Sequence, residues 1–187
     1  MGVSLNFRAT EIEGCYLVET ERASDDRGWF QRLFDEAPFK EAGFKEKIVQ
    51  INQANNKNRG TLRGLHYQLP PHAESKIVSC LSGKLRDVAV DLRKNSSTFL
   101  KWISVELSSD KPKFFLIAKG CAHGYATLQE NTTVLYFHSG IYSPEYERGI
   151  NYLDPILNIA WKETITTISD RDKGLPFLEK DFEGIAL

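Results

Sequence analysis

Short apolar runs separated by turn residues dominate the chain. The runs are rich in Val, Ile, Leu, Phe and Tyr, and they cover residues 15–18, 47–52, 87–92, 103–107, 114–118 and 132–137. Residues 103–107 alternate apolar and polar side chains, which indicates strands with one face packed inward and the other turned outward. Strands at this spacing, with turn clusters between them, predict an all-β barrel or sandwich.

Helical periodicity is limited to short pieces of the sequence. One piece lies around residues 39–43 and another in the C-terminal tail. The sequence shows no internal repeat, low-complexity stretch or interdomain linker. We therefore expect a single domain over residues 1–187, with a β core at about residues 58–150 and flanking arms.

The composition is that of an ordinary globular protein. Of the 187 residues, 41% are hydrophobic and 26% are charged, which suffices for a core without disulfides or metal. A formal net charge of -1 supplies no field that would attract nucleic acid or an anionic membrane, although a local basic patch can still bind a small anion. Neither nucleic acid nor a membrane is expected as a partner.

The cysteines and the N-terminal residues bear on location. Cys15, Cys80 and Cys121 lie far apart and form no CxxC pair, which is typical of free thiols in a reducing compartment. The N-terminus lacks the charged-then-apolar pattern of a signal peptide, and no apolar stretch approaches the roughly 20 residues that span a bilayer. We expect a cytoplasmic protein.

Arg63 and His66 are the first candidates for chemistry. In a regular strand they would lie on opposite faces, so a pocket that uses both needs a break in the pleat. Gly64 stands between them and suits a bulge. The alternative is a surface arginine and a core histidine with a satisfied hydrogen bond, because histidine has many structural uses.

Other candidates are ambiguous one by one. Lys76 opens a strand and alone would be a solvated lysine. His123, followed by Gly124, fits either the mouth of a barrel or a polar turn. Tyr136 lies in an apolar strand and fits the core equally well, and residues 170–172 suggest only a polar turn.

Several cofactor classes lack a motif. The histidines His66, His72, His123 and His138 show no ligand spacing, so no metal is expected, although separated residues can converge in space. Neither a GxGxxG loop nor a P-loop is present, so no nicotinamide or phosphoryl-transfer role is indicated. The absence of a Gly-x-Ser-x-Gly elbow weakens hydrolase interpretations. We expect no cofactor.

Taken together, ordered stretches over nearly the whole chain resemble the dTDP-4-dehydrorhamnose 3,5-epimerase family of the rhamnose pathway. They are DDRG at 25–28, LRGLHYQ at 62–68, DVAVDLR at 87–93, STF at 97–99, VELS at 105–108, AHG at 122–124, LY at 135–136, YSP at 142–144, GIN at 149–151, DP at 154–155 and IAW at 159–161. The resemblance implies a metal-free cupin, an all-β jelly-roll barrel with short flanking helices, that pairs as a homodimer. Its substrate would be a nucleotide-diphospho-sugar.

The resemblance also implies roles for individual residues. His66 takes the position of the catalytic base, Asp172 of the aspartate that orients it, and Tyr136 of the proton donor. Lys76 matches the lysine near the keto oxygen of the sugar. The positions that bind sugar or nucleotide are matched by Arg27, Gln50, Asn52, Arg63, His123, Glu147 and Arg171.

The chemistry accounts for these residue types. A proton next to a ketone is weakly acidic, so Lys76 would stabilise the enolate oxygen while His66, with an unperturbed pKa of about 6.5, accepts the proton. Asp172 would fix the tautomer of the imidazole, and Tyr136 would reprotonate the carbon from the opposite face. Arginines suit a diphosphate through charge-assisted, often bidentate hydrogen bonds.

The chain departs from the family pattern at several positions. Arg32 replaces an acidic residue, Ile51 replaces an aspartate between Gln50 and Asn52, and Lys119 replaces a glutamate. Residues 137–138 are Phe and His where the family has Lys and Thr. These changes at the rim of the pocket predict an altered nucleotide or sugar specificity.

Three alternatives to a 3,5-epimerase remain. One base–acid pair also serves a mono-epimerase at C3 or C5, and a ketoisomerase fits the same barrel. A cupin that only binds a sugar nucleotide is a different class, which the retention of all four catalytic residue types disfavours.

Overall fold

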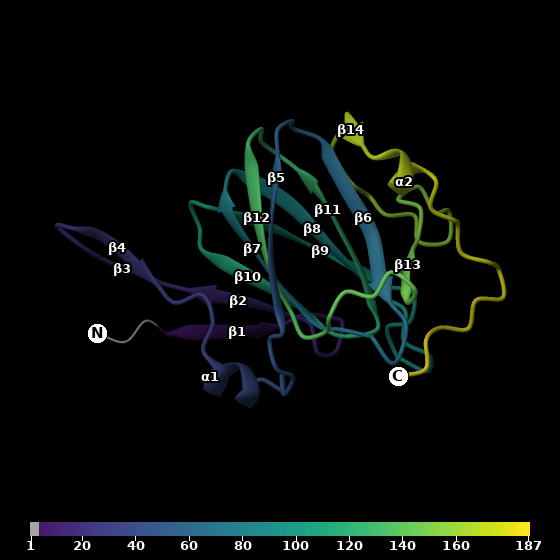
Figure 1. Cartoon of the computed structure of the whole chain (residues 1–187), viewed down its shortest axis with the longest axis horizontal. Coiled ribbons are helices and arrows are strands. Elements are labelled where there is room, and N and C mark those ends of the chain that lie inside the picture. The colour runs from purple at the N-terminus through teal and green to yellow at the C-terminus, as the bar shows by residue number, and fades with distance from the viewer. Residues whose placement is uncertain (1–3) are drawn as a thin grey trace.

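Two facing sheets form the body of the molecule (Figure 1), as seen in a computed structural model that describes residues 4–187. The first sheet has the order β1 (Leu5–Ala9), β2 (Tyr16–Thr20), β10 (Lys113–Ile117), β7 (Lys76–Ser82), β12 (Thr132–His138), β5 (Gln50–Asn56). The second has the order β13 (Glu147–Gly149), β6 (Thr61–Gln68), β11 (Cys121–Thr127), β8 (Lys84–Asp91), β9 (Trp102–Ser108), with β14 (Thr167–Ile168) parallel to β6. The all-β prediction is confirmed.

The apolar runs of the sequence correspond closely to strands. The runs at 87–92, 103–107, 114–118 and 132–137 coincide with β8, β9, β10 and β12. The run at 47–52 was placed too early, because β5 begins at Gln50 and continues to Asn56 along the edge of β12. The β core also extends beyond the expected 58–150, since β1, β2 and β5 belong to the first sheet. Residues 1–3, which belong to the expected domain and to the N-terminus that lacks a signal-peptide pattern, lie outside the described residues.

The two helices of the described chain are short. In α1 (Glu36–Glu41) the side chain of Asp35 caps the N-terminus, so the helix begins before the expected 39–43. Phe39 turns inward from α1 and packs edge-on against Phe7 of β1 at 4.9 Å. The tail contributes α2 (Asp170–Lys173), whose N-terminus is capped by the side chain of Ser169. Within residues 4–187 no helix is long and apolar enough to cross a membrane.

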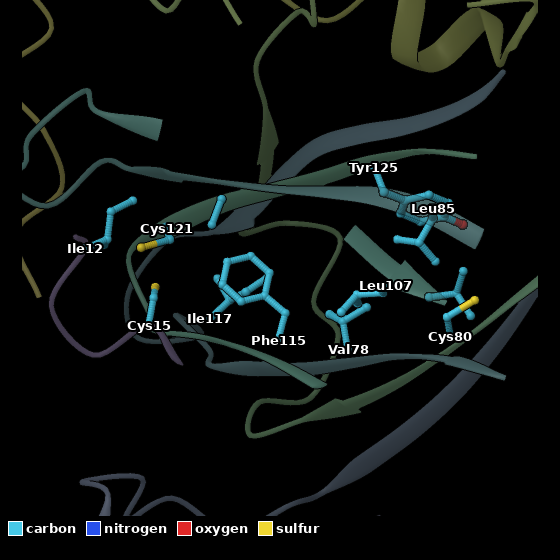
Figure 2. Close-up of a cluster of buried hydrophobic side chains, with 12 residues drawn as sticks. Ile12, Cys15, Val78, Cys80, Leu85, Leu107, Phe115, Ile117, Cys121 and Tyr125 are labelled. Carbon is cyan, nitrogen blue, oxygen red and sulfur yellow. The ribbon is translucent and has the colours of Figure 1, made fainter. Parts of the chain in front are cut away.

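An apolar cluster fills the space between the sheets. Figure 2 shows it running from Ile12 and the neighbouring Cys15 and Cys121 at one end to Tyr125 at the other. On β11 the side chains of Cys121 and Tyr125 join this cluster, while Ala122 and Ala126 pack against the C-terminal segment on the outer face. Since both faces are covered, every residue of β11 is buried. Tyr125 also lines a cavity, so the pocket described below lies at its end of the cluster.

Asp91 anchors the loop that follows β8. Its fully buried carboxylate accepts hydrogen bonds from the backbone and guanidinium of Arg93 and from the hydroxyls of Ser96 and Thr98, both at 2.6 Å. Burial opposes ionisation, but these donors outweigh it and hold the pKa of Asp91 well below its ordinary value. A carboxylate so held stabilises the folded state only while it is ionised.

We expect Asp91→Asn to lower the free energy of unfolding by about 3–5 kcal/mol near pH 7, because it leaves the largely buried Arg93 without its anion. A depressed carboxylate pKa adds stability above its unfolded value, near 3.8, and loses it as pH falls toward the folded value. The difference between wild type and variant in urea unfolding should therefore shrink as the pH is lowered below about 4. Asp110→Asn, at an exposed position, is the control. A gap that stays constant with pH would contradict this role.

Candidate active site

Strand β6 carries one extra residue at Gly64–Leu65. His66 is paired with His123 of β11, but Arg63 is paired with Tyr125, so three steps on β6 match two on β11. Gly64 has a φ of +108°, and a Cβ atom there would lie 2.6 Å from the carbonyl oxygen of His123. Only glycine fits this combination of backbone angle and close approach. The bulge expected at Gly64 is confirmed, and it turns Arg63 and His66 into the same pocket.

His66 is bonded to Asp172 from the C-terminal segment. The distance from His66 Nε2 to Asp172 Oδ1 is 2.9 Å, and the other carboxylate oxygen accepts the backbone N–H of Gly64 at 3.1 Å. Burial opposes ionisation of Asp172, but the hydrogen bond and charge of His66 outweigh it and lower the pKa of the carboxyl. An ionised Asp172 accepts the Nε2 proton, which leaves the Nδ1 lone pair of neutral His66 free to act as a base.

Tyr136 reaches the pocket from the opposite sheet. It lies on β12, and its ring centroid is 6.3 Å from that of His123 and 6.4 Å from that of Tyr125. Burial raises the pKa of Tyr136 well above its ordinary value, and the neighbouring Tyr125 and Asp87 add to the shift. The phenol is therefore protonated at neutral pH and has a proton to give.

These side chains surround a cavity of about 350 Å³, which is within the range of small-molecule sites. It is lined by Asn52, Gln53, Ala54, Arg63, His66, Tyr67, Gln68, Glu74, Lys76, His123, Tyr125, Tyr136, His138, Tyr142, Glu147, Ser169, Arg171 and Asp172. Of the eleven catalytic and binding residues expected from the family resemblance, nine line this cavity. Arg27 and Gln50 are the two that do not. The fold thus assembles most of the expected site within one chain.

Arg27 and Gln50 lie elsewhere. Arg27 sits at the turn of a two-stranded ribbon, β3 (Arg22–Asp25) and β4 (Gly28–Gln31), that projects from the body (Figure 1). Its side chain is 90% exposed and pairs with Asp25. Gln50 accepts a hydrogen bond from the backbone of Tyr142 at 3.3 Å, beside the pocket. Neither residue lines the cavity within its own chain.

Glu147 organises one side of the cavity. Its carboxylate accepts a hydrogen bond from Tyr142 Oη at 2.7 Å and forms a close ion pair with Arg171. Burial opposes ionisation of Glu147, but Tyr142 and Arg171 outweigh it and lower its pKa. The charge of Arg171 is consequently shared with a carboxylate of the same chain.

Sequence reasoning missed two acidic partners in this region. Asp87 is fully buried on β8 and binds Nε2 of His123 through Oδ1 at 2.5 Å, while its Oδ2 has no hydrogen-bond partner among residues 4–187. His123 therefore lies mid-strand, facing the pocket, and not in a turn. Glu74 binds His138 and Lys76. The sequence signals for Asp87 were its place at the start of an apolar run and within the family-like stretch at 87–93, and neither indicated a partner for it. Within the same residues, no group of three or more His, Cys, Asp and Glu side chains is arranged to hold a metal ion.

Comparison with known proteins connects this geometry to a family. The family model described as dTDP-4-dehydrorhamnose 3,5-epimerase matches residues 9–180. The chain belongs to the dTDP-4-dehydrorhamnose 3,5-epimerase family. The enzyme of that name from Shigella flexneri is 39% identical over 180 residues, covering 95% of this chain and 99% of its own. The expected isomerase class is confirmed.

Two solved structures share the fold. A dTDP-6-deoxy-D-glucose-3,5-epimerase from Legionella pneumophila Philadelphia 1, in complex with dTDP-4-keto-L-rhamnose, has a TM-score of 0.87 and 36% identity over 93% of each chain. A 3'-monoepimerase from Streptomyces bikiniensis, in complex with dTDP-quinovose, has a TM-score of 0.83 and 34% identity over 90% of this chain and 85% of its own. The expected cupin jelly-roll fold is confirmed.

Most positions at which the chain departs from the family pattern lie outside the cavity. Arg32 pairs with Asp35 of its own chain, and Ile51 is exposed on β5, away from the cavity. His138 alone among the departures lines the cavity. The altered specificity expected from these positions stays a prediction, with His138 as its main candidate.

We expect Gly64→Ala to destabilise the fold by about 1–3 kcal/mol and to lower epimerase activity about 100-fold, because the new methyl group would displace the His123 carbonyl and misplace His66. Urea unfolding and a turnover assay measure the two effects. Gly43→Ala is the matched control, since Gly43 has a similar φ of +99° but open space around its Cβ position. Equal losses of activity in both variants would rule out the steric role of Gly64.

Proposed function

We propose that this protein inverts C3 and C5 of a nucleotide-linked 4-keto-6-deoxyhexose, converting dTDP-4-dehydro-6-deoxyglucose to dTDP-4-dehydrorhamnose. The observation that carries the proposal is the placement of a histidine–aspartate pair and a protonated tyrosine on opposite walls of one cavity. Inversion requires removal of a proton from one face of a carbon and delivery to the other, and two facing sheets supply those two sides.

In the proposed reaction His66 removes the proton next to the C4 ketone. Its imidazolium would be stabilised by Asp172, which is ionised and hydrogen-bonded to it. Lys76 lies on the same cavity and would stabilise the negative charge that develops on the keto oxygen. Tyr136 would then protonate the carbon from the opposite side.

The diphosphate would be held by the cationic and polar groups of the cavity. Arg63 lies on the wall beside His66, with its Nε donating to Asn56 at 2.9 Å. Asn52, His123, Glu147 and Arg171 complete the polar lining. Arginine forks suit phosphate oxygens, which supports a nucleotide-diphospho-sugar as the ligand.

A deuterium-exchange experiment separates this function from its alternatives. The protein is incubated with dTDP-4-dehydro-6-deoxyglucose in heavy water and followed by NMR. Deuterium at both C3 and C5 is expected, whereas deuterium at one carbon would indicate a mono-epimerase, as the similar protein from Streptomyces bikiniensis is named. Exchange at neither carbon, with the ligand still bound, would reduce the protein to a binding cupin.

We expect His66→Ala to lower the rate of exchange at both carbons by about 10²–10⁴-fold, because the variant lacks the imidazole that Asp172 orients beside the bulge. The same NMR assay measures it. His72→Ala is the control, since the ring of His72 packs at a tilt against Tyr146 and does not line the cavity. Undiminished exchange in His66→Ala would show that the base has been misassigned.

We also propose a homodimer in the cytoplasm. Trp29 and Phe30 on the projecting ribbon are 59% and 61% exposed, and Ile51 is 58% exposed on β5, the end strand of the first sheet. Apolar side chains of this size favour burial against a partner. A ribbon that reaches a second subunit would also bring Arg27 to a pocket, which it does not line in its own chain. The free thiols Cys15, Cys80 and Cys121 support a reducing compartment.

We expect Phe30→Glu to convert the dimer to a monomer, because a charge would be buried at the centre of the proposed interface. Sedimentation equilibrium at micromolar concentration measures the mass. Phe177→Glu, at a residue of similar exposure in the C-terminal segment, should leave the dimer intact. A wild-type protein that sediments as a monomer would refute the pairing.

A further inference from the structure

Lys76 and His138 face each other across neighbouring strands of the first sheet. They are register partners on β7 and β12, which places their side chains on the same face, toward the cavity. Glu74, two residues before β7 begins, bridges them with a different oxygen to each. Its Oε1 lies 3.4 Å from Lys76 Nζ, and its Oε2 lies 3.0 Å from His138 Nδ1.

The three side chains are largely shielded from water. The exposed fractions are 7% for Glu74, 12% for Lys76 and 14% for His138. Burial opposes ionisation of Glu74, but the hydrogen bond from His138 and the charge of Lys76 outweigh it, so its pKa lies below the ordinary value. An ionised carboxylate only accepts hydrogen bonds, so His138 Nδ1 carries the proton that it donates. A buried pair of this kind is costly to break from either side.

The backbone under these residues is fixed as well. Ser75, between Glu74 and Lys76, takes a hydrogen bond from Ser139 N through its carbonyl at 3.0 Å and gives its own N–H to Ser139 Oγ at 2.8 Å. Ser139 directly follows His138, so the two ends of the bridge are joined through the main chain. Gly140 allows this approach, since a Cβ atom there would lie 2.8 Å from Cβ of Glu74.

We propose that Glu74 and His138 are positioning residues that fix the ammonium group of Lys76 in the cavity, through the path His138 Nδ1–Glu74–Lys76 Nζ. The inference rests on the role of Lys76 in the proposed function. A lysine side chain is a flexible four-carbon stem, and an electrophile aids an enolate only when it already points at the oxygen where charge develops. His138 holds the carboxylate, and the carboxylate holds the ammonium.

Two amide substitutions distinguish the nitrogens of His138. Asparagine places an amide N–H near the position of Nδ1 and so keeps the bond to Glu74, whereas glutamine places its amide near Nε2, which faces Asn52 Nδ2 at 3.4 Å. We expect His138→Gln and His138→Leu to lower kcat about 10- to 100-fold with little change in KM, and His138→Asn to retain most of kcat. Glu74→Gln should lose kcat as His138→Leu does.

A second measurement does not depend on turnover. Heteronuclear NMR of ¹⁵N-lysine-labelled protein should show a slowly exchanging ammonium signal for Lys76 in the wild type and in His138→Asn, which disappears in His138→Leu and Glu74→Gln. Lys76→Arg assigns the signal, and His72→Asn is the control for loss of a histidine. These spectra test the path even if the protein were inactive on the keto sugar, so that a failure of the proposed function would be recognised separately.

Two results would overturn the inference. One is recovery of kcat in His138→Gln but not in His138→Asn, which would assign His138 a direct contact with substrate through Nε2. The other is an unchanged Lys76 ammonium signal in both His138→Leu and Glu74→Gln, which would show that neither residue holds it.

Discussion

The extra residue in β6 at Gly64–Leu65 is the constraint on which the site depends. It rotates the strand so that Arg63 and His66 face one cavity, and it aims the Gly64 N–H at Asp172. The carboxylate of Asp172 therefore binds both the backbone of the bulge and the ring of His66. Strand geometry and catalytic geometry are coupled at this point, because a regular strand would lose both contacts together.

Pairing with carboxylates governs the electrostatics of the cavity. In the described chain three histidines each bind an acidic side chain, and the pairs are His66–Asp172, His123–Asp87 and His138–Glu74. A buried carboxylate needs donors and a buried imidazole needs an oriented proton, so each pair supplies a donor to the carboxylate and an acceptor to the imidazole. The pairs come from different elements, and the cavity thereby obtains fixed tautomers on several walls.

Much of the fold and part of the site follow from sequence. Strands with apolar side chains on a covered face, such as β8 and β12, were predicted closely, because buried strands appear in the sequence as apolar runs. The polar strand β5 was placed too early, since its pairing with β12 decides its bounds. His66 and Gly64 were recognised from local order and family likeness. The bond between Glu74 and His138 joins positions 64 residues apart, and only the register of β7 and β12 brings them together.

The distance along the chain between His66 and Asp172 has a consequence for how the protein is made. The two residues are 106 positions apart, and the proposed base depends on both of them. During synthesis the chain emerges from its N-terminus, so β6 is available long before α2 exists. The barrel walls can therefore form around a histidine that still lacks its partner. The His66–Asp172 pair is therefore completed late in biogenesis, when the C-terminal segment docks on the bulge.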